Sequence, residues 1–516
     1  MKIDKILWAD DEIDLLIPHV LFLKDKGYEV VTVCSGQDAL DKCHRQTFDL
    51  IFLDENMPGL SGLQTLVKIK EITPDTPVVM ITKSEDEGIM EQAIGSKIAD
   101  YLIKPVNPNQ ILLSIKKNLH KNRIITETTT SGYQQDFMKI DMQINDSFSA
   151  EDWKDVYKKL TYWDLELEES QTEMYVEMLH TQKDEANRLF TRFIKNNYLE
   201  WIANPDSRPI ISPDIFKRTV FPTLDNGERL FFVLIDNFRF DQWRTVKEML
   251  SEYFTSNEDL YYSILPTATQ YARNAIFSGL MPVQIEKMFP ELWVDEDSEE
   301  GKNLNEEPLI RTQIERFRRK FTFSYNKINN SAQGEKLLHN FDNTDNYQLN
   351  VIVLNFVDML SHARTESKII RELASSEAAY RSLTRSWFEH SNTINLFRRI
   401  AEKGCKIVLV TDHGTIRVSN AIKVTGDKDT NNNLRYKLGK NLSYNRKEVF
   451  EITRPEQAGL PTPNISSKYI FAQNRDFFSY PNNYNYYVQY FMDTFQHGGI
   501  SLEEMLVPLI TLSPKI

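Results

Sequence analysis

Five short apolar runs near the start of the chain, each followed by an amphipathic stretch, restrict the possible folds most strongly. They read KILWAD, YEVVTV, FDLIFLD, PVVMIT and DYLIKP, and stretches of helical period such as EIDLLIPHVLFLKDKG lie between them. This alternation is typical of parallel strands joined by helices, with ligand sites at the carboxyl ends of the strands. We therefore expect a doubly wound sheet of five parallel strands and five helices over residues 1–120.

Four of these five runs end on residues suited to phosphoryl chemistry. Asp10 and Asp11 follow the first run, and Asp54 ends the third. Thr82 ends the fourth run and Lys104 the fifth. Because the ends of parallel strands meet at one edge, the three carboxylates should bind Mg²⁺, which prefers carboxylates together with water and phosphate oxygens. A hydroxyl and an ammonium group facing them could hold a phosphoryl group on Asp54.

This set of motifs resembles the receiver domain of two-component response regulators, which has a flavodoxin-like fold. The quoted stretch LIFLDENMPGLSG carries Asp54 at the position of the phosphoacceptor. The resemblance also implies roles for five other residues: Asp10 and Asp11 as magnesium ligands, Thr82 and Lys104 as the phosphoryl-sensing pair, and Tyr101 as the aromatic switch.

Residues 121–205 read as a helical connector. Gly and Pro nearly vanish there, and apolar residues recur at helical spacing in WKDVYKKLTYWDLELE and ANRLFTRFIKNNYLEWI. We expect about three helices, forming a small bundle or a signalling stalk, with TETTTSGYQQ as a loop at their start. The aromatic stripe Trp153, Tyr157, Tyr162 and Trp163 is expected in a core, because no basic residues interleave with it as in a base-stacking platform.

Residues 206–516 return to strand and helix alternation, and their buried strands end on metal-binding side chains. RLFFVLID ends in Asp236, and IVLVTDHG ends in Asp412 and His413. The strand in YQLNVIVLNFVDMLSH is followed by Asp358, with His362 four residues later, so one face of a helix would carry both. These strand ends predict a cleft lined with potential ligands.

One more histidine, His497, lies in the glycine loop FQHGGISLEEMLVP. The six side chains suffice for two zinc ions, each with three mixed nitrogen and oxygen ligands, as is typical of catalytic rather than structural zinc. The expected sets are Asp358, His362 and His497 for one ion, and Asp236, Asp412 and His413 for the other.

The stretch LPTATQYARNAIFSGLMP supplies a candidate nucleophile. Thr267 and Thr269 follow the strand LYYSIL and precede a helix expected to start near Ala272, whose amino terminus favours an anion. A threonine that merely caps this helix is the alternative.

In this order the motifs DNFRFDQW, PTATQ, VDMLSH, TDHG and HGGISLEEMLVP resemble the PglZ branch of the alkaline phosphatase superfamily. The resemblance covers residues 206–516 and places Thr269 at the nucleophile position. Gln270 and Tyr271 depart from the phosphodiesterase pattern, and the phosphate-binding Asn of those enzymes has no clear counterpart. Arg239 and Arg273 remain candidates for stabilising the transition state, or else form surface ion pairs.

The whole chain resembles the response regulators of type IX protein secretion, which join a receiver to a PglZ domain. This resemblance implies a sensor histidine kinase as phosphodonor and a role in that secretion system, with possible transcription or secretion-system proteins as partners. We expect a two-zinc phosphodiesterase acting on oligonucleotides or cyclic nucleotides, controlled through Asp54 phosphorylation and homodimer formation. Long polar segments at about 285–345 and 415–475 are expected to form a substrate lid.

Charge and composition limit the alternatives. A formal net charge of -13 argues against a long-range attraction to nucleic acid, and no convincing DNA-binding motif stands out. Three cysteines without paired spacing argue against a disulfide framework, and no signal peptide or membrane-inserting run is found, which predicts a cytoplasmic protein. Two other functions stay open: a catalytically weak module that binds a nucleotide or protein, and a direct transcriptional regulator.

Overall fold

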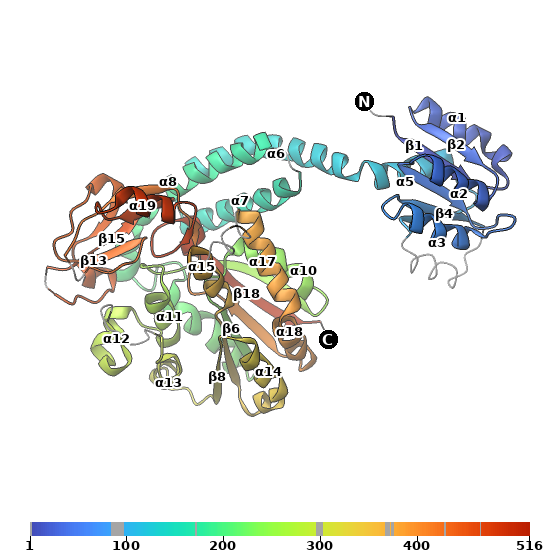
Figure 1. The fold of residues 1–516 in the computed structure, drawn as a ribbon. Helices are drawn as coiled ribbons and strands as arrows, with labels where there is room; N and C mark the ends of the chain where they lie inside the picture. The colour runs from blue at the N-terminus through green and yellow to red at the C-terminus, as the bar shows by residue number, and fades with distance from the viewer. Residues whose placement is uncertain are drawn as a thin grey trace. The chain divides into compact units, whose positions relative to one another are not determined.

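A computed structural model describes residues 3–83, 98–170, 173–295, 303–366, 372, 376–427, 430–464 and 466–515. The chain divides into two compact units, Met1–Ser131 and Gly132–Ile516 (Figure 1).

The first unit is a five-stranded sheet in the order β2-β1-β3-β4-β5, and every neighbouring pair is parallel. Its strands are β1 (Lys5–Ala9), β2 (Glu29–Val33), β3 (Leu50–Asp54), β4 (Val78–Thr82) and β5 (Asp100–Ile103). Its helices are η1 (Ile13–Leu16), α1 (Ile17–Asp25), α2 (Gly36–Arg45), α3 (Gly62–Ile72) and α5 (Pro108–Leu119). The five parallel strands are confirmed, whereas the helix expected between β4 and β5 falls on residues 84–97, outside the described residues.

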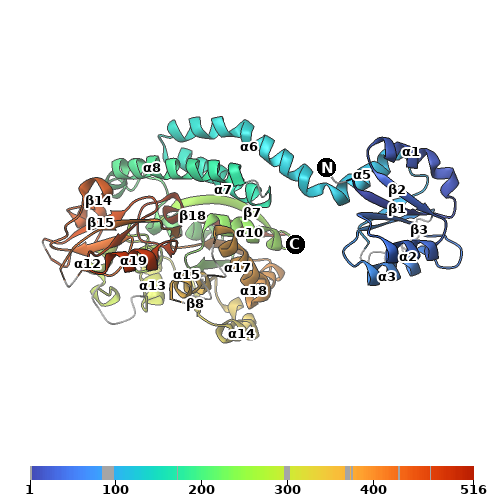
Figure 2. The same cartoon turned by 45° about the horizontal axis from the view of Figure 1, so that its top comes forward.

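Helices cover both faces of this sheet. Figure 2 shows α2 and α3 on one face, and α1 and α5 on the other. Two separate apolar clusters fill the layers between them: Leu40, Leu66 and Ile69 pack on one face, and Leu23 and Ile111 on the other. All five residues of β3 are buried, which explains why this strand reads as a continuous apolar run.

Three helices follow: α6 (Lys121–Asn145), α7 (Ala150–Ser170) and α8 (Glu173–Ala203). The loop expected at TETTTSGYQQ is wrong, because these residues lie within α6. Packing overrides their weak helix propensity: Tyr133 is fully buried with its ring 5.5 Å from that of Trp163, and Gly132 leaves room for the same indole. No described helix, the 31-residue α8 included, is long and apolar enough to cross a bilayer.

The connector helices share a hydrophobic core with the strands that follow. Trp153 and Tyr157 are buried as expected, and Trp163 also lies inside, but Tyr162 is 46% exposed and lies outside the core. The Trp153 ring lies 5.4 Å from that of Phe190, and Trp201 on α8 packs at 5.0 Å against Tyr262 of the main sheet. This part of the chain is therefore continuous with the core of the larger unit.

The larger unit is built on a six-stranded sheet in the order β7-β18-β10-β6-β9-β8. Its strands are β6 (Leu230–Ile235), β7 (Phe254–Tyr262), β8 (Phe323–Ile328), β9 (Leu349–Leu354), β10 (Lys406–Val410) and β18 (Leu506–Pro514). β10, β6, β9 and β8 are parallel, while β18 runs antiparallel to both β10 and β7. β7 therefore points in the same direction as the four parallel strands.

The helices between these strands have the following bounds: η2 (Ser212–Asp214), η3 (Phe216–Val220), α9 (Phe221–Asp225), α10 (Phe240–Leu250), α11 (Thr269–Ser278), α12 (Pro282–Met288), η4 (Pro290–Leu292), α13 (Glu306–Arg316), α14 (Ser331–His339), η5 (Phe341–Asn346), α15 (Phe356–Glu366), α17 (Glu377–His390), α18 (Asn392–Glu402) and α20 (Leu502–Met505).

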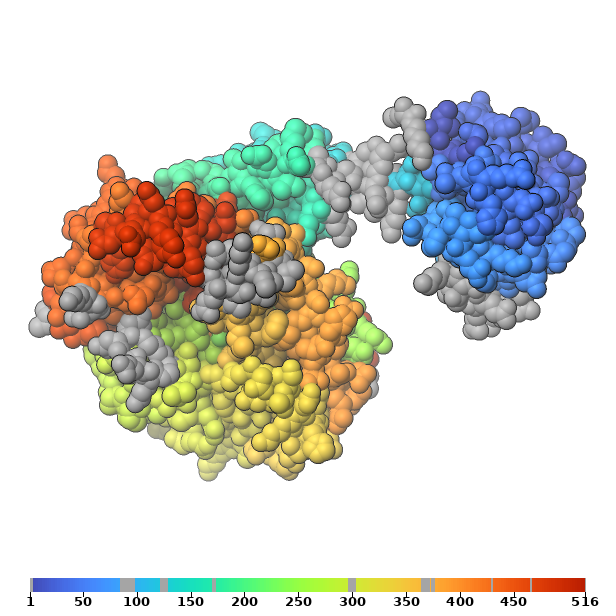
Figure 3. All heavy atoms as spheres, viewed as in Figure 1, coloured from blue at the N-terminus to red at the C-terminus, as the bar shows by residue number. Residues whose placement is uncertain are grey.

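Residues 416–496, between β10 and β18, form a separate layer that we call the cap. It contains β11 (Ile416–Arg417), β12 (Asn420–Lys423), β13 (Tyr436–Gly439), η6 (Arg446–Glu448), β14 (Val449–Ile452), η7 (Pro455–Ala458), β15 (Lys468–Ala472), β16 (Asp476–Ser479), α19 (Tyr484–Phe491) and β17 (Phe495–Gln496). These strands make three small sheets of their own. Figure 3 shows the orange cap and the red α19 at the surface of one end of this unit.

The two segments expected to form a lid therefore differ. Residues 415–475 lie almost entirely in the cap, where they add a layer that the main sheet does not need. Residues 285–345 instead supply β8 at the edge of the main sheet, together with α13 and α14, because their apolar positions pack into the common core. This second segment mostly extends the main fold.

A buried ionic cluster ties the connector to the sheet. Arg381 on α17 is 4% exposed and donates hydrogen bonds to Asp164 and Glu168 on α7, and to Asp241 on α10. Asp241 also accepts a hydrogen bond of 2.9 Å from Nε of Arg239. The two guanidinium groups hold the pKa of Asp241 below its usual range, although burial opposes this.

We expect Arg381→Ala to destabilise this unit by about 3–5 kcal/mol, because it removes one of the two cations that compensate each of the buried carboxylates Asp164 and Asp241. Urea unfolding of the full chain, followed by tryptophan fluorescence, measures this change. Arg398→Ala is the matched control, since Arg398 is 49% exposed and pairs with Glu402 at only 3.7 Å, and it should change the free energy of unfolding by less than about 0.5 kcal/mol. Equal effects of the two replacements would contradict a structural role for the cluster.

Candidate functional sites

The first site lies at the carboxyl end of the receiver-like sheet. Asp10, Asp11 and Asp54 each place a carboxylate oxygen within 4.8 Å of the others. Lys104 Nζ lies 2.8 Å from Asp54 Oδ1 and 2.9 Å from Asp10 Oδ2, so one ammonium group bridges two carboxylates. A Cβ on Gly62 would lie 2.4 Å from the Asp54 carbonyl oxygen, which explains the glycine at the start of α3.

Burial and charge set the chemistry of this cluster. Asp54 is 3% exposed, and burial raises the pKa of its carboxyl group, while Lys104 opposes this rise. Thr82 is fully buried at the end of β4, and Tyr101 lies half-buried on β5. Asp10 and Asp54 are buried and Asp11 is exposed, so two carboxylates lie inside and one faces solvent, an arrangement suited to a divalent cation that also binds water.

The second site lies at the carboxyl ends of the parallel strands in the larger sheet. Asp236 follows β6, Asp412 and His413 follow β10, and Asp358 lies in the first turn of α15 after β9. His497 precedes β18, which starts at this edge because it runs antiparallel to its neighbours. The directions of the strands thus bring together Asp236 and His497, which lie more than 250 residues apart in the sequence.

The six side chains form two adjacent groups, as their sequence positions suggested. Ligand atoms of Asp358, His362 and His497 lie within 4.8 Å of one another, as do those of Asp236, Asp412 and His413. The rings of His413 and His497 stack with centroids 4.2 Å apart, so the groups share a boundary.

Backbone carbonyls fix the orientation of two imidazoles. Nδ1 of His413 lies 3.1 Å from the Gly414 carbonyl oxygen, and Nδ1 of His497 lies 3.0 Å from that of Thr267. A carbonyl can only accept, so each Nδ1 carries the proton and each Nε2 presents a lone pair. Burial lowers the pKa of both rings, that of His497 to about 4, and keeps both neutral near pH 7.

Glycine is required beside His413 for a steric reason. A Cβ on Gly414 would lie 2.0 Å from the Glu503 carbonyl oxygen, so only glycine lets this loop pass α20. The sequence Asp-His-Gly therefore combines two potential ligands with the one residue that permits their position.

The donor set fits a metal. Asp236 Oδ1 is buried and has no hydrogen-bond partner among the described residues. Burial and the nearby Asp412 carboxylate raise the pKa of Asp236 well above its usual range, although Arg273 opposes this rise. Carboxylate oxygens and imidazole nitrogens are ligands that zinc accepts. A cation between these groups would compensate the buried negative charge.

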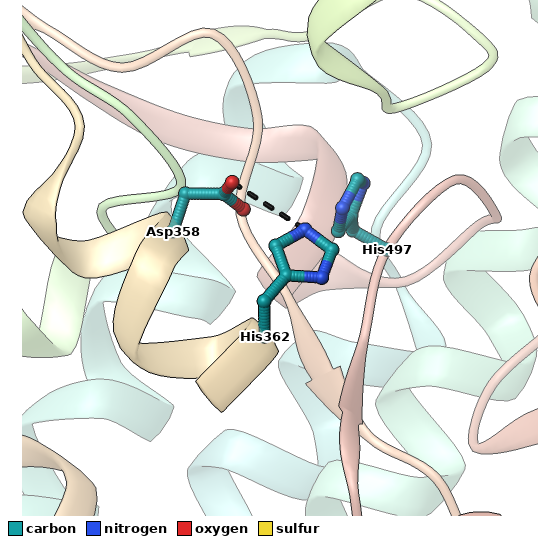
Figure 4. Close-up of side chains that lie close together, drawn as sticks. All are labelled: Asp358, His362 and His497. Carbon is teal, nitrogen blue, oxygen red and sulfur yellow. Dashed lines mark ion pairs between the residues drawn. The ribbon is translucent and has the colours of Figure 1, made fainter. Parts of the chain in front are cut away.

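Figure 4 shows Asp358 and His362 projecting from one helix toward His497, which lies on a separate loop. His362 Nε2 lies 3.4 Å from Asp358 Oδ2, and the His362 side chain is 63% exposed. The i and i+4 spacing on α15 places both on one face, as the sequence predicted.

Asn237 is a residue that the sequence reasoning missed. Its Nδ2 donates to Asp358 at 3.3 Å, and its backbone N–H donates to Asp412 at 3.4 Å, so it connects the two groups. Its φ of 58° lies in the left-handed region, which asparagine tolerates better than most residues. The signal was an Asn directly after a strand that ends in Asp.

Thr267 and Thr269 have different surroundings. The Thr267 hydroxyl is fully buried, donates to the Gly499 carbonyl at 2.9 Å and accepts from the Gly498 N–H at 3.0 Å. The Thr269 hydroxyl lies 3.0 Å from His413 Nε2, at the amino terminus of α11. Thr267 thus holds the loop of His497, while Thr269 faces the ligand groups.

Neither candidate arginine is a surface residue. Arg239 is 2% exposed and pairs with Asp241 and Glu377, neither of which belongs to a ligand group. Arg273 is 1% exposed, and its Nε lies 2.9 Å from Asp412 Oδ2, with Asp236 as a second partner. Surface ion pairs are therefore the wrong interpretation for both, and Arg273 orients two of the potential ligands.

A cleft of about 790 Å³ opens beside Thr269 and His497. Its walls come from three parts of the chain: the start of α11, Asn303, and the cap between Asp427 and Ser467. The cleft therefore connects Thr269 and His497 with the cap.

A family model described as the BREX system PglZ alkaline phosphatase-like domain matches residues 215–512, more than half of the chain. The chain belongs to the PglZ family. A response regulator receiver domain matches residues 6–116, and the PorX response regulator linker domain matches residues 123–202. The protein is therefore a response regulator with a PglZ output domain, in a PorX-like order of receiver, linker and PglZ domain.

Curated relatives match a smaller part of the chain. The transcriptional regulatory protein ZraR of Escherichia coli K12 is 33% identical over 124 residues, 24% of this chain and 28% of its own length. The regulatory protein PhoP of Bacillus subtilis is 27% identical over 174 residues, 33% of this chain and 71% of its own. The chain thus spans under a third of the length of ZraR.

Among solved structures, a CheY-like receiver domain from Methanospirillum hungatei is 27% identical, with a TM-score of 0.23, and covers 23% of this chain and 96% of that one. The CheY4 protein of Vibrio cholerae is 29% identical, with a TM-score of 0.22, and covers 23% of this chain and all of that one.

Proposed function

We propose that the PglZ domain is a zinc-dependent phosphodiesterase acting on oligonucleotides or cyclic nucleotides, and that phosphorylation of Asp54 controls it. The observation that carries this proposal is the Thr269 hydroxyl at a helix amino terminus, 3.0 Å from His413 and beside two groups of three potential ligands. A nucleophile, a cation site and an open cleft are the parts that hydrolysis at phosphorus needs.

The residues of this chain have distinct roles in the proposed reaction. One zinc would be held by Asp236, Asp412 and His413, and the other by Asp358, His362 and His497. When bound, two zinc ions supply Lewis acidity, which lowers the pKa of a nearby hydroxyl and stabilises charge on phosphoryl oxygens.

Thr269 Oγ1 gives up its proton and attacks phosphorus as the bond to the leaving oxygen breaks, and that oxygen takes up a proton and departs as an alcohol. Water then breaks the Oγ1–phosphorus bond of the phosphothreonine, which returns a proton to Oγ1 and releases a phosphate monoester. The amino terminus of α11 favours the anionic phosphoryl group beside Thr269. Arg273 is balanced by Glu306 at 3.1 Å, so it positions Asp236 and Asp412 without adding net charge. Three ligand carboxylates then leave two zinc ions with about one surplus positive charge, which suits a singly charged diester.

Control begins at the receiver. A sensor histidine kinase would transfer its phosphoryl group to Asp54, with Mg²⁺ held by Asp10, Asp11 and Asp54. The Lys104 ammonium already lies 2.8 Å from Asp54, where it can pair with the added oxygens, and Thr82 and Tyr101 would respond. A homodimer formed by the phosphorylated protein would carry the signal in type IX protein secretion.

We expect two zinc ions per chain after zinc reconstitution and gel filtration. His362→Ala should reduce the content to about one, because it removes one ligand of a single group and its exposed side chain is not needed for folding. Inductively coupled plasma mass spectrometry measures both values.

The matched control for this replacement is His390→Ala, an exposed histidine at the end of α17 that belongs to neither ligand group. It should keep both ions. A chain that retains no zinc, or a His362→Ala protein that retains two ions, would rule out the assigned ligand sets.

A further inference from the structure

The cleft beside Thr269 is large enough for more than the phosphoryl group. Its volume of about 790 Å³ falls within the range of about 300–1,000 Å³ found for small-molecule sites. Thr269 and His497 form one part of its lining, and the cap and Asn303 form its other walls. A diester held at Thr269 would therefore extend one of its two substituents along these walls.

The walls carry amide groups. Asn432 and Asn464 line the cleft, both are exposed, and no hydrogen bond to either side chain is found within the described part of the chain. Asn303 adds a buried Oδ1 that has no partner among the same residues. An amide offers a donor and an acceptor side by side, which matches the hydrogen-bonding edge of a nucleobase.

The amide wall is held firmly relative to the reacting end. Asn433 Oδ1 accepts from the backbone N–H of Arg435 at 2.7 Å and of Tyr436 at 3.2 Å, which fixes the loop. Arg435 is fully buried and forms two hydrogen bonds with Glu504, of 3.1 and 2.6 Å. Glu504 also accepts from the Gly499 N–H at 2.9 Å, two residues after His497. These buried contacts fix the loop that carries Asn432 relative to the loop of His497.

Among the described residues, the lining of the cleft contains one lysine, Lys440, which is exposed. Asp427, the carboxylate of the lining, already accepts from Asn441 Nδ2 at 2.9 Å. Lys440 is thus available for an anion that enters with the substrate. A second phosphate of a nucleotide chain is an anion that a lysine holds well.

We propose that this cleft is a nucleoside subsite: Asn303, Asn432 and Asn464 bind the edge of one base, and Lys440 binds the next phosphate. The inference rests on the proposed function and names its substrate class, a diester of at least two nucleotides in which one base is recognised.

The test measures binding to the zinc-loaded full chain carrying Thr269→Val, which avoids turnover. Calorimetry would compare a 5′-phosphorylated dinucleotide with two analogues, each lacking one base. We expect one analogue to bind about 10-fold more weakly or worse than the dinucleotide. The double change Asn432→Ala, Asn464→Ala should weaken dinucleotide binding by about 10–100-fold and leave binding of that analogue unchanged, since each lost hydrogen bond costs up to about 10-fold.

Lys440→Ala should weaken dinucleotide binding by about 10-fold. Removal of the 5′-phosphate from the ligand should weaken binding to the parent protein by the same factor, and it should cause no further loss in the Lys440→Ala protein. Asn485→Ala and Lys447→Ala are matched controls, because both residues are exposed and lie outside the cleft. Neither should change the affinity.

The outcomes separate this inference from the proposed function. Equal affinity for the dinucleotide and both analogues, or no dinucleotide binding, overturns the nucleoside subsite even if the wild-type protein hydrolyses a simple diester. Base-dependent binding lost with Asn432 and Asn464 supports the subsite, and a wild-type protein that binds in this way without hydrolysis overturns only the phosphodiesterase.

Discussion

Replacing Thr269 with valine should reduce kcat for diester hydrolysis by at least about 10³-fold, while the protein folds and binds zinc as before. Valine keeps the shape of threonine but removes the oxygen that lies 3.0 Å from His413 Nε2. None of the six potential ligands is changed. Release of p-nitrophenol from bis(p-nitrophenyl) phosphate measures the rate, and elemental analysis measures the zinc.

Two other threonines test whether the effect belongs to the hydroxyl at this position. Thr223→Val removes a helix hydroxyl that donates only to the Thr219 carbonyl, and it should leave the rate unchanged. Thr267→Val breaks the hydrogen bonds to Gly498 and Gly499, so it should lose zinc together with activity. Full activity of the Thr269→Val protein would show that another oxygen attacks phosphorus, and the main support for the mechanism would be lost.

Beryllofluoride with Mg²⁺, a stable mimic of the phosphoryl group, should convert the protein from mostly monomer to mostly dimer and change its diesterase rate. Lys104 now bridges Asp54 and Asp10, and new oxygens on Asp54 would compete for its ammonium group. Thr82 can then move toward these oxygens, and Tyr101 can follow. A complete change in population requires a preference of about 5.5 kcal/mol for the paired state.

Light scattering reports the mass, and the chromogenic assay reports the rate in the same samples. Asp54→Ala should abolish both responses, because no carboxylate remains to hold the mimic. Asp38→Ala is a suitable control, since this exposed aspartate lies on α2, outside the acidic cluster. An unchanged mass and rate with the mimic would show that the receiver does not act through dimerisation.

The receiver and the ligand groups could be predicted because their signals are local. A buried strand that ends on Asp or His places that side chain at the sheet edge whatever the rest of the chain does, as Asp54, Asp236 and Asp412 illustrate. The spacing of Asp358 and His362 fixes their common helix face in the same way. The parallel direction of the five strands in the first sheet also followed from alternation alone.

Other features depended on contacts that no local pattern shows. TETTTSGYQQ has the composition of a loop, and its helical state comes from Tyr133 packing against Trp163, 30 residues away. The role of Asn237 depends on the ends of two strands, which meet beside it. The burial of Arg239 depends on an ionic cluster that three helices build together. Each of these required the assembled core.

That common core also determines which pieces of this protein can be exchanged. The receiver ends within the unit Met1–Ser131, whereas Trp153 and Trp201 of the linker are packed against side chains of the larger unit. A chimaera joined near Gly132, within α6, would transfer most of the linker together with the PglZ domain as one folded module. A junction near residue 206 would instead expose the apolar surface around Tyr262 that the linker covers. We therefore expect the linker and the PglZ domain to be exchanged together, both in evolution and in engineered proteins.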